Sequence, residues 1–228
     1  MPANRSPRRF RAVRALIALA AAPVAVGLSA ALPTTAVPSA HAAGCNDIEV
    51  VWARGTTEDP GVGRVGNAFV QALRGKVGGR SVGAYGVIYP ASYDFLQATA
   101  GANDASWHIQ WVMDNCPATR IVLGGYSQGA AVVDALAAVP VPGLGFDAPL
   151  PGNAPEHIAG LVTFGNPAGK FGMSLANSPV WAGRAIDLCN AGDPVCNLGI
   201  FDATDVEAHR AYAGGPAYQA AGFIAGLL

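Results

Sequence analysis

One stretch, residues 120–138, constrains the fold of this chain more than any other. It begins with the apolar run Arg120–Gly125, which predicts a buried strand, and ends with the small-residue segment Gln128–Ala138, which predicts a helix. Between them lies a G-x-S-x-G pattern, typical of a nucleophile elbow, with Ser127 as the candidate nucleophile. Because the chain has 29 glycines, this short motif is informative only together with the strand and helix around it.

The first 42 residues have the composition of a cleaved export signal. A cluster of five arginines is followed by the apolar stretch Ala15–Leu32 and by Ala40-His41-Ala42, a small-x-small cleavage site. A membrane anchor is the alternative, but a proline and a glycine interrupt the apolar stretch. We therefore predict that residues 1–42 are removed, and that residues 43–228 form one secreted domain in the extracellular space or the cell envelope.

The predicted mature part is acidic. The whole chain has 14 Lys plus Arg and 15 Asp plus Glu, and all the charges in the export signal are arginines. The mature part therefore keeps 9 basic and 15 acidic residues, a net charge of −6. This charge argues against nucleic acid as a partner.

The four cysteines, Cys45, Cys116, Cys189 and Cys196, all lie in the predicted mature part. An even number in an exported chain predicts two disulfides, and four cysteines allow three pairings. The competing interpretation is a metal site. Because the cysteines fall in no zinc-type paired spacing and the sequence has no H-E-x-x-H motif, we expect neither a metal nor another cofactor.

The order of apolar runs and helical segments predicts an α/β fold. Strands that alternate with helices imply a central, mostly parallel sheet of five strands, covered on both faces in a three-layer α/β/α sandwich. Sites in such sheets lie beyond the carboxyl ends of the strands. The proline-rich segment Pro140–Pro155 is predicted to be a surface loop. The predicted strands are Ile48–Ala53, Ser81–Tyr89, Arg120–Gly125, Ile158–Gly165 and Arg184–Cys189, and the predicted helices are Arg64–Lys76, Ala91–Asn115 and Gln128–Ala138.

A serine hydroxyl is a poor nucleophile until a histidine accepts its proton. His41 belongs to the export signal, and His108 lies inside a predicted helix. His157 lies where the fourth predicted strand begins, which is the wrong end of the sheet. His209 is therefore the candidate base.

A carboxylate commonly orients such a histidine, and an order of serine, acid and histidine would place it between positions 127 and 209. Asp193 is the best placed of the acids in this interval. It follows the fifth predicted strand and lies between Cys189 and Cys196, which would close a tight loop if they were bonded. The alternative is a solvated turn aspartate before a proline, and the flanking cysteines favour the catalytic interpretation.

Four motifs in this order resemble those of the cutinase family, and most of all its actinobacterial, mycobacterial-type members. The resemblance covers essentially the whole predicted mature chain and is far more specific than the elbow alone. It implies an α/β-hydrolase fold of the cutinase type. The motifs are Val51–Glu58, Gly124–Gly129, Cys189–Cys196 and Ala208–Tyr212.

The resemblance implies a role for each candidate residue. Ser127 is the implied nucleophile, His209 the general base and Asp193 the acid that orients it. The implied oxyanion hole consists of the backbone amides of Thr56 and Gln128, with the Thr56 hydroxyl as an additional donor. Fungal members have serine where this chain has Thr56, so the hydroxyl is kept and a methyl group is added.

The resemblance also implies the disulfides Cys45–Cys116 and Cys189–Cys196. Chain entropy assigns about 4 kcal/mol of stabilisation to the long first loop and about 2.5 kcal/mol to the short second loop. The second bridge therefore matters more for placing Asp193 than for overall stability.

Membership of such a family implies a secreted serine carboxylesterase that hydrolyses short- to medium-chain esters through an acyl-enzyme. We expect a monomer whose substrates extend to lipids and polyesters, with transient contact to a lipid surface. Two groups of apolar residues could line an acyl cleft. They are Tyr93, Phe95 and Leu96 on one side, and Leu198, Ile200, Phe201 and Val206 on the other.

The sequence leaves other functions open. A phospholipase or a thioesterase would use the same three catalytic residues, and so would an acetyl-sugar esterase. From another functional class, a secreted binding or antigenic protein could carry the same residues with little or no catalysis.

Overall fold

The computed structural model describes residues 44–138, 145–197 and 205–228. The predicted export signal lies outside the described residues, as do Leu198, Ile200 and Phe201 of the predicted acyl cleft. Within the described ranges, no helix is both long and apolar enough to cross a bilayer.

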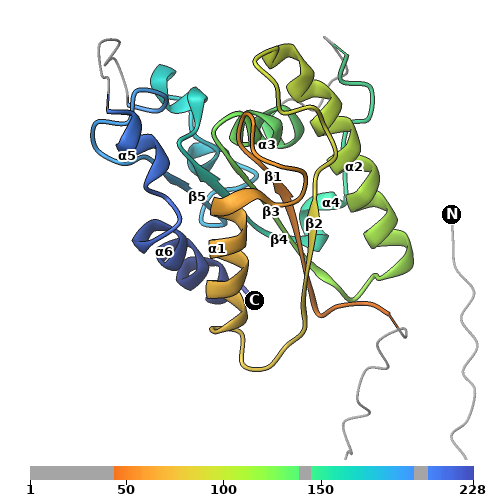
Figure 1. Ribbon diagram of the computed structural model, residues 1–228. Coiled ribbons are helices and arrows are strands. Elements are labelled where there is room, and N and C mark those ends of the chain that lie inside the picture. The colour runs from red at the N-terminus through yellow and green to blue at the C-terminus, as the bar shows by residue number, and fades with distance from the viewer. Residues whose placement is uncertain (1–43, 139–144, 198–204) are drawn as a thin grey trace, which may run out of the picture. The chain divides into compact units, whose positions relative to one another are not determined.

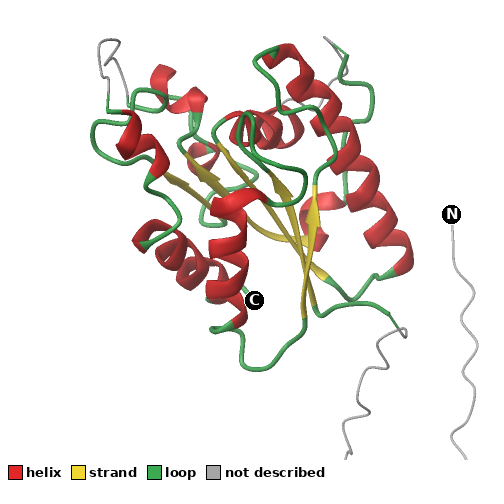
Figure 2. Ribbon diagram, in the orientation of Figure 1, coloured by secondary structure: helices red, strands yellow, loops and turns green. Residues whose placement is uncertain are grey.

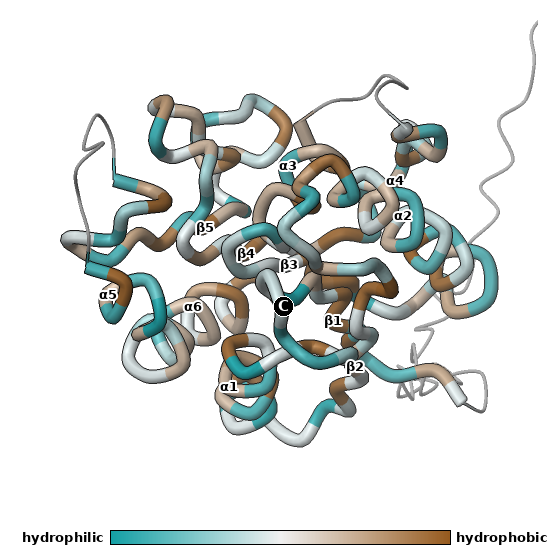
Figure 3. The backbone as a smooth tube through the Cα atoms, turned by 45° about the horizontal axis from the view of Figure 1, so that its top comes forward, coloured by the Kyte–Doolittle hydropathy of each residue, from teal (hydrophilic) through white to brown (hydrophobic). Residues whose placement is uncertain are grey.

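Five strands form the central sheet, in the order β2-β1-β3-β4-β5 (Figure 1). All four pairings between these strands are parallel, so the predicted five-stranded sheet is confirmed. β1, β3 and β4 are almost wholly buried, as expected for strands covered on both faces, and β1 is mostly hydrophobic in Figure 3. The strands are β1 (Ile48–Ala53), β2 (Val82–Gly86), β3 (Arg120–Tyr126), β4 (Ile158–Phe164) and β5 (Ala185–Leu188).

Helices flank the sheet on both faces (Figure 2). Successive side chains of a strand point to opposite faces, so one strand serves two cores. Trp52 of β1 belongs to the core under α1 and α6, whereas its neighbour Val51 belongs to the core under α2 and α3. The helices are α1 (Gly63–Arg74), α2 (Ala98–Asn115), α3 (Gln128–Ala138), α4 (Ala154–His157), α5 (Val206–Arg210) and α6 (Gly215–Ala225).

Some predicted boundaries are wrong. The strand predicted for Ser81–Tyr89 is shorter at both ends. The helix predicted from Ala91 begins at Ala98, after a 3-10 turn at Phe95–Gln97, because Ala91 has a φ of 48° and cannot belong to a right-handed helix.

Three helices of the described chain, α4, α5 and α6, were absent from the predicted fold. In its described part, the predicted loop Pro140–Pro155 ends in the first residues of α4. Helix α6 has no predicted counterpart, because its alanines, glycines and apolar side chains give no clear polar face by which a surface helix is recognised. Helices α4 and α6 are held by packing against the sheet.

A disulfide joins Cys45, just before β1, to Cys116, just after α2. The two cysteines are 71 positions apart in the sequence. The bond therefore closes the longest covalent loop of the described chain and fixes the edge of the sheet opposite to the candidate site.

A buried polar cluster lies between α3 and the last two strands. Asn166, which is fully buried, donates from Nδ2 to Asp134 Oδ1 at 3.2 Å and to Asp187 Oδ2 at 3.5 Å. Burial raises the pKa of Asp134 to about 7, although the hydrogen bond from Asn166 opposes this rise. Burial also raises the pKa of Asp187. Two carboxyl groups, one on α3 and one on β5, therefore share one side-chain amide.

This cluster predicts a loss of stability at neutral pH. A carboxyl whose pKa is raised in the folded state stabilises the fold fully at low pH, and this contribution disappears as the pH rises through the folded pKa. We therefore expect the Tm to fall from about pH 4 to about pH 7, and Asp134→Asn to reduce that fall. Asp114→Asn, on the exposed side of α2, is the control. A Tm difference between wild type and Asp134→Asn that stays constant over this pH range would contradict the assignment.

Candidate active site

Ser127 lies on the sharp turn between β3 and α3, at the carboxyl edge of the sheet. Its φ is 56°, a left-handed conformation that is rare for a residue other than glycine, and its amide donates to the Phe164 carbonyl at 2.9 Å. Flanking glycines allow this turn. A Cβ on Gly125 would lie 2.1 Å from the Gly129 oxygen, and a Cβ on Gly129 would lie 2.0 Å from the Ala53 oxygen. The turn thus lifts one hydroxyl above the sheet.

The structure brings Ser127, His209 and Asp193 together from three separate segments. The Ser127 Oγ lies 2.9 Å from His209 Nε2, and His209 Nδ1 lies 2.8 Å from Asp193 Oδ2. With an ionised carboxylate, Nδ1–H donates to Asp193 and leaves Nε2 free to accept the serine proton. The arrangement can therefore generate a nucleophilic serine.

Asp193 is fully buried and accepts two more hydrogen bonds. The Val195 amide donates to Oδ1 at 2.7 Å, and the Tyr212 hydroxyl donates to Oδ2 at 2.6 Å. Burial alone would raise the pKa of Asp193, but the hydrogen bonds from His209, Tyr212 and Val195 outweigh it and lower the pKa below its ordinary value. Asp193 is therefore ionised at neutral pH despite its burial.

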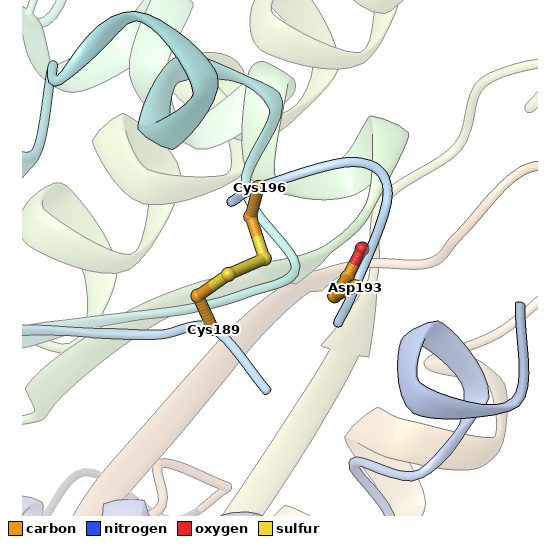
Figure 4. Close-up of side chains that lie close together, drawn as sticks. All are labelled: Cys189, Asp193 and Cys196. Atoms are coloured by element: carbon orange, nitrogen blue, oxygen red, sulfur yellow. A yellow bond between two sulfur atoms is a disulfide. The ribbon is translucent and has the colours of Figure 1, made fainter. Parts of the chain in front are cut away.

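A disulfide between Cys189 and Cys196 closes the loop that carries Asp193 (Figure 4). The Asn197 side chain donates to the carbonyl oxygens of Asn190 at 2.9 Å and Asp193 at 2.8 Å. These hydrogen bonds stabilise the loop in addition to the disulfide. Ligand atoms of Cys189, Asp193 and Cys196 lie within 4.8 Å of one another. Both sulfur atoms are committed to the disulfide and are not available as thiolate ligands.

Two tyrosines orient the histidine and its acid. The Tyr126 hydroxyl donates to the His209 carbonyl at 2.8 Å, and the two rings lie 5.1 Å apart. Tyr212 accepts the Asn190 amide while it donates to Asp193. Sequence reasoning assigned no role to either tyrosine, although both lie in the motifs that carry the family resemblance.

The other two described histidines lie away from Ser127. His108 stacks on Tyr85 with ring centroids 3.6 Å apart and has a hydrogen bond to Glu49 at 3.3 Å. His157 ends α4 immediately before β4, at the opposite edge of the sheet from Ser127.

Thr56 and Gln128 lie on either side of Ser127, where an oxyanion hole is predicted. Among the described residues, neither backbone N–H has a hydrogen-bond partner. The Thr56 hydroxyl, expected as an additional donor, instead donates to Gln128 Oε1 at 3.2 Å. The two amides can therefore donate hydrogen bonds to an oxygen that develops negative charge. The Thr56 hydroxyl joins the two sides of the hole through its hydrogen bond to Gln128.

Arg54 and Glu58 hold the loop that presents Thr56. The Glu58 carboxylate accepts the amides of Gly55 at 2.7 Å and Arg64 at 2.9 Å. The buried Arg54 side chain donates to the Glu58 carbonyl at 2.8 Å and to two carbonyl oxygens beyond β2. The sequence analysis assigned no role to either residue. The local sequence does not distinguish a charged side chain that holds a loop in place from one that is exposed to solvent.

Ser127 borders two cavities of different chemical character. The first, here called the apolar cavity, has a volume of about 350 Å³ and is lined by Thr56, Phe95, Ser127, Gln128, Ala131, Pro167 and Val195. The second, here called the polar cavity, has a volume of about 370 Å³ and is lined by Thr56, Thr57, Glu58, Arg64, Tyr93, Tyr126, Ser127, Val206, His209 and Arg210.

The predicted acyl-cleft residues are divided between these cavities. Phe95 lines the apolar cavity, whereas Tyr93 and Val206 line the polar cavity. Leu96 lines neither cavity and is 72% exposed. The apolar cavity instead has walls from α3, from the turn after β4 and from the disulfide loop, none of which the sequence identified.

Sequence comparisons find proteins that are similar over most of the chain. Residues 44–228 match a family model described as Cutinase. A Mycobacterium tuberculosis protein named Phospholipase Culp4 is 51% identical over 218 residues, covering 95% of this chain and 93% of its own. Another protein of that organism, named Probable carboxylesterase Culp3, is 46% identical over 197 residues, covering 86% and 75%.

Solved structures have the same architecture. A Trichoderma reesei cutinase in complex with a phosphonate inhibitor has a TM-score of 0.64 and 33% identity, covering 80% of this chain and 77% of its own. The catalytic core of an acetyl xylan esterase from Trichoderma reesei has a TM-score of 0.65, covering 81% and 100%. Its identity is only 24%, so it supports the fold alone.

The Tyr212 hydroxyl can be tested separately from the catalytic residues. Tyr212→Phe removes one hydrogen bond to a buried carboxylate, so we expect Ser127 to react about tenfold more slowly with an organophosphonate. The free energy of unfolding should fall by about 1–2 kcal/mol. The rate of mass gain and urea unfolding measure the two effects. Tyr218→Phe, on the exposed side of α6, is the matched control, and an unchanged labelling rate in Tyr212→Phe would contradict the role.

Proposed function

We propose that this chain, which belongs to the cutinase family and is a serine carboxylic ester hydrolase, acts through a covalent intermediate on Ser127. One observation carries the proposal. The Ser127 Oγ, the His209 ring and the Asp193 carboxylate form a continuous hydrogen-bonded line, with distances of 2.9 Å and 2.8 Å.

In the proposed reaction, His209 Nε2 accepts the Ser127 proton while Oγ attacks the ester carbonyl. The amides of Thr56 and Gln128 stabilise the oxyanion, and one such donor is typically worth about 3 kcal/mol in the transition state. His209 then gives its proton to the leaving alcohol. A water molecule, activated by His209, hydrolyses the acyl-enzyme and restores the Ser127 hydroxyl.

We propose short- to medium-chain acyl groups, since the apolar cavity beside Ser127 has a volume of only about 350 Å³. Contact with a lipid surface is supported by exposed apolar side chains in the two segments that supply Phe95 and Pro167 to this cavity. Tyr93, Phe95 and Leu96 precede α2, Phe171 ends the 3-10 turn that begins at Pro167, and Met173 follows it; all five are more than half exposed. Two disulfides are consistent with a secreted protein.

The nucleophile is tested by Ser127→Ala. We expect kcat for p-nitrophenyl butyrate to fall by at least about a thousandfold, because the covalent route is lost. Circular dichroism and unfolding should show an intact fold. The wild-type protein should gain one organophosphonate adduct at Ser127, and Ser127→Ala should gain none. A folded wild-type protein that gains no adduct and hydrolyses no ester would favour the binding-protein alternative.

Lipid-surface contact is tested by replacing one exposed apolar residue in each of these two segments. Leu96→Ser combined with Phe171→Ser should lower the rate on tributyrin emulsion several-fold, because less apolar area can enter the interface. The control is Tyr218→Ser, whose exposed ring lies against Lys76 beyond the far end of α1. Equal rates on emulsion for the control and the double variant would contradict surface contact.

A further inference from the structure

We infer that exposed aromatic side chains at the outer edge of the sheet bind a neutral polysaccharide, at a site separate from the two cavities at Ser127. The surface, here called the aromatic face, consists of Tyr85, Ile88, Trp107, His108 and Trp111. It lies where α2 runs beside the edge strand β2 and the chain that follows it (Figure 1). None of its residues lines the apolar or the polar cavity, so the inference goes beyond the proposed function.

Two of the four tryptophans of this chain serve the fold, and two do not. Trp52 is fully buried, and Trp181 is buried and donates from Nε1 to the Ala137 carbonyl at 3.1 Å. Trp107 and Trp111 are instead 62% and 55% exposed, and no described residue accepts a hydrogen bond from either indole N–H. They lie one turn apart on α2, so their side chains share one face. Large rings that the fold leaves in water mark an interaction surface.

Stacking between rings holds part of the aromatic face in place. The ring centroids of Tyr85 and His108 are 3.6 Å apart with 5° between the planes, and those of His108 and Trp111 are 6.1 Å apart with 21°. The Tyr85 hydroxyl donates to Asp104 at 3.0 Å, and His108 Nε2 lies 3.3 Å from Glu49 Oε1. Three nearly parallel rings are thus fixed before any partner arrives, which lowers the entropy cost of binding.

A sugar ring suits this surface chemically. The C–H bonds of a pyranose gather on its faces, and the negative face of an aromatic ring attracts them. The hydroxyl groups at the edge of the sugar need donors and acceptors. The indole N–H groups of Trp107 and Trp111 are donors. Asp104 lies three positions before Trp107 and Asp114 three positions after Trp111, so both carboxylates share this face as acceptors.

Charge argues against the other partners that an exposed aromatic surface could have. Neither α2 nor β2 contains a lysine or an arginine, whereas the carboxylates of Glu49, Asp104 and Asp114 adjoin the rings or share their helix face. Nucleic acid and anionic lipid head groups would therefore be repelled. A second copy of this chain, bound through a twofold contact, would place the same carboxylates against one another. A neutral polymer of sugars meets neither penalty.

Affinity electrophoresis in native gels tests the binding, with hydroxyethylcellulose, galactan and mannan as three neutral polymers. We expect at least one of them to retard the wild-type protein. Trp107→Ala combined with Trp111→Ala should weaken the affinity for that polymer at least about tenfold, because two stacking surfaces are lost. Trp111→Phe should keep more affinity than Trp111→Ala, since it retains a ring. The control is Tyr218→Ala, which removes an exposed ring from α6.

Hydrolysis of p-nitrophenyl butyrate by the same proteins separates binding from catalysis. The double variant should stay within about twofold of the wild-type rate, because sites that share no partners act independently. This result would also show that the double variant is folded. Bound polymer should in addition protect Trp107 and Trp111 of the wild type from oxidation by N-bromosuccinimide, as measured by mass spectrometry of peptides.

The opposite results are equally clear. No retardation by any of the three polymers would overturn the inference, and so would equal retardation of the wild type and the double variant. Binding to phosphatidylcholine vesicles that depends on the two tryptophans, without binding to the polymers, would identify a membrane site instead. A dimer that only the double variant loses would identify a second copy as the partner. Neither outcome bears on whether Ser127 is the nucleophile.

Discussion

A single buried charge, the carboxylate of Asp193, determines how the carboxyl edge of this fold is built. A carboxylate without water is very costly unless donors surround it. The His209 ring, the Tyr212 hydroxyl and the Val195 amide supply those donors, and they come from α5, from the chain before α6 and from the disulfide loop. The disulfide loop, α5 and the chain before α6 thus meet around one negative charge.

The parallel sheet makes this arrangement possible. Its strands all end at one edge, so the loops after β1, β3 and β5 bring Thr56, Ser127 and Asp193 to a common place although they are distant in sequence. The same loops wall the two cavities. Rigid strands fix where each loop begins, and hydrogen bonds within each loop, such as those of Arg54 and Glu58, fix where its side chains point.

The sequence predicted those parts of the molecule that depend on local pattern. The apolar runs of β1, β3 and β4 and the turn around Ser127 are short, continuous signals, and the predicted sheet matches the observed one. Contacts between distant residues were not predictable in this way: nothing near Tyr212 indicates Asp193, and nothing near Pro167 indicates a cavity wall. Asp193 itself could be selected because it follows a predicted strand and because two cysteines flank it. Helix α6 escaped prediction because small residues give little periodic contrast.

The Cys189–Cys196 bond makes the activity of the enzyme depend on the redox conditions around it. The loop that it closes carries the acid of the site, and closing such a short loop contributes about 2.5 kcal/mol towards its ordered form. In a reducing cytoplasm the two cysteines would be thiols, and the donors around Asp193 would have to be assembled without that help. The geometry around Asp193 is therefore completed most readily under oxidising conditions, in which the bond forms. An esterase whose acid is held in this way would lose activity under reducing conditions even where the rest of its fold stays intact.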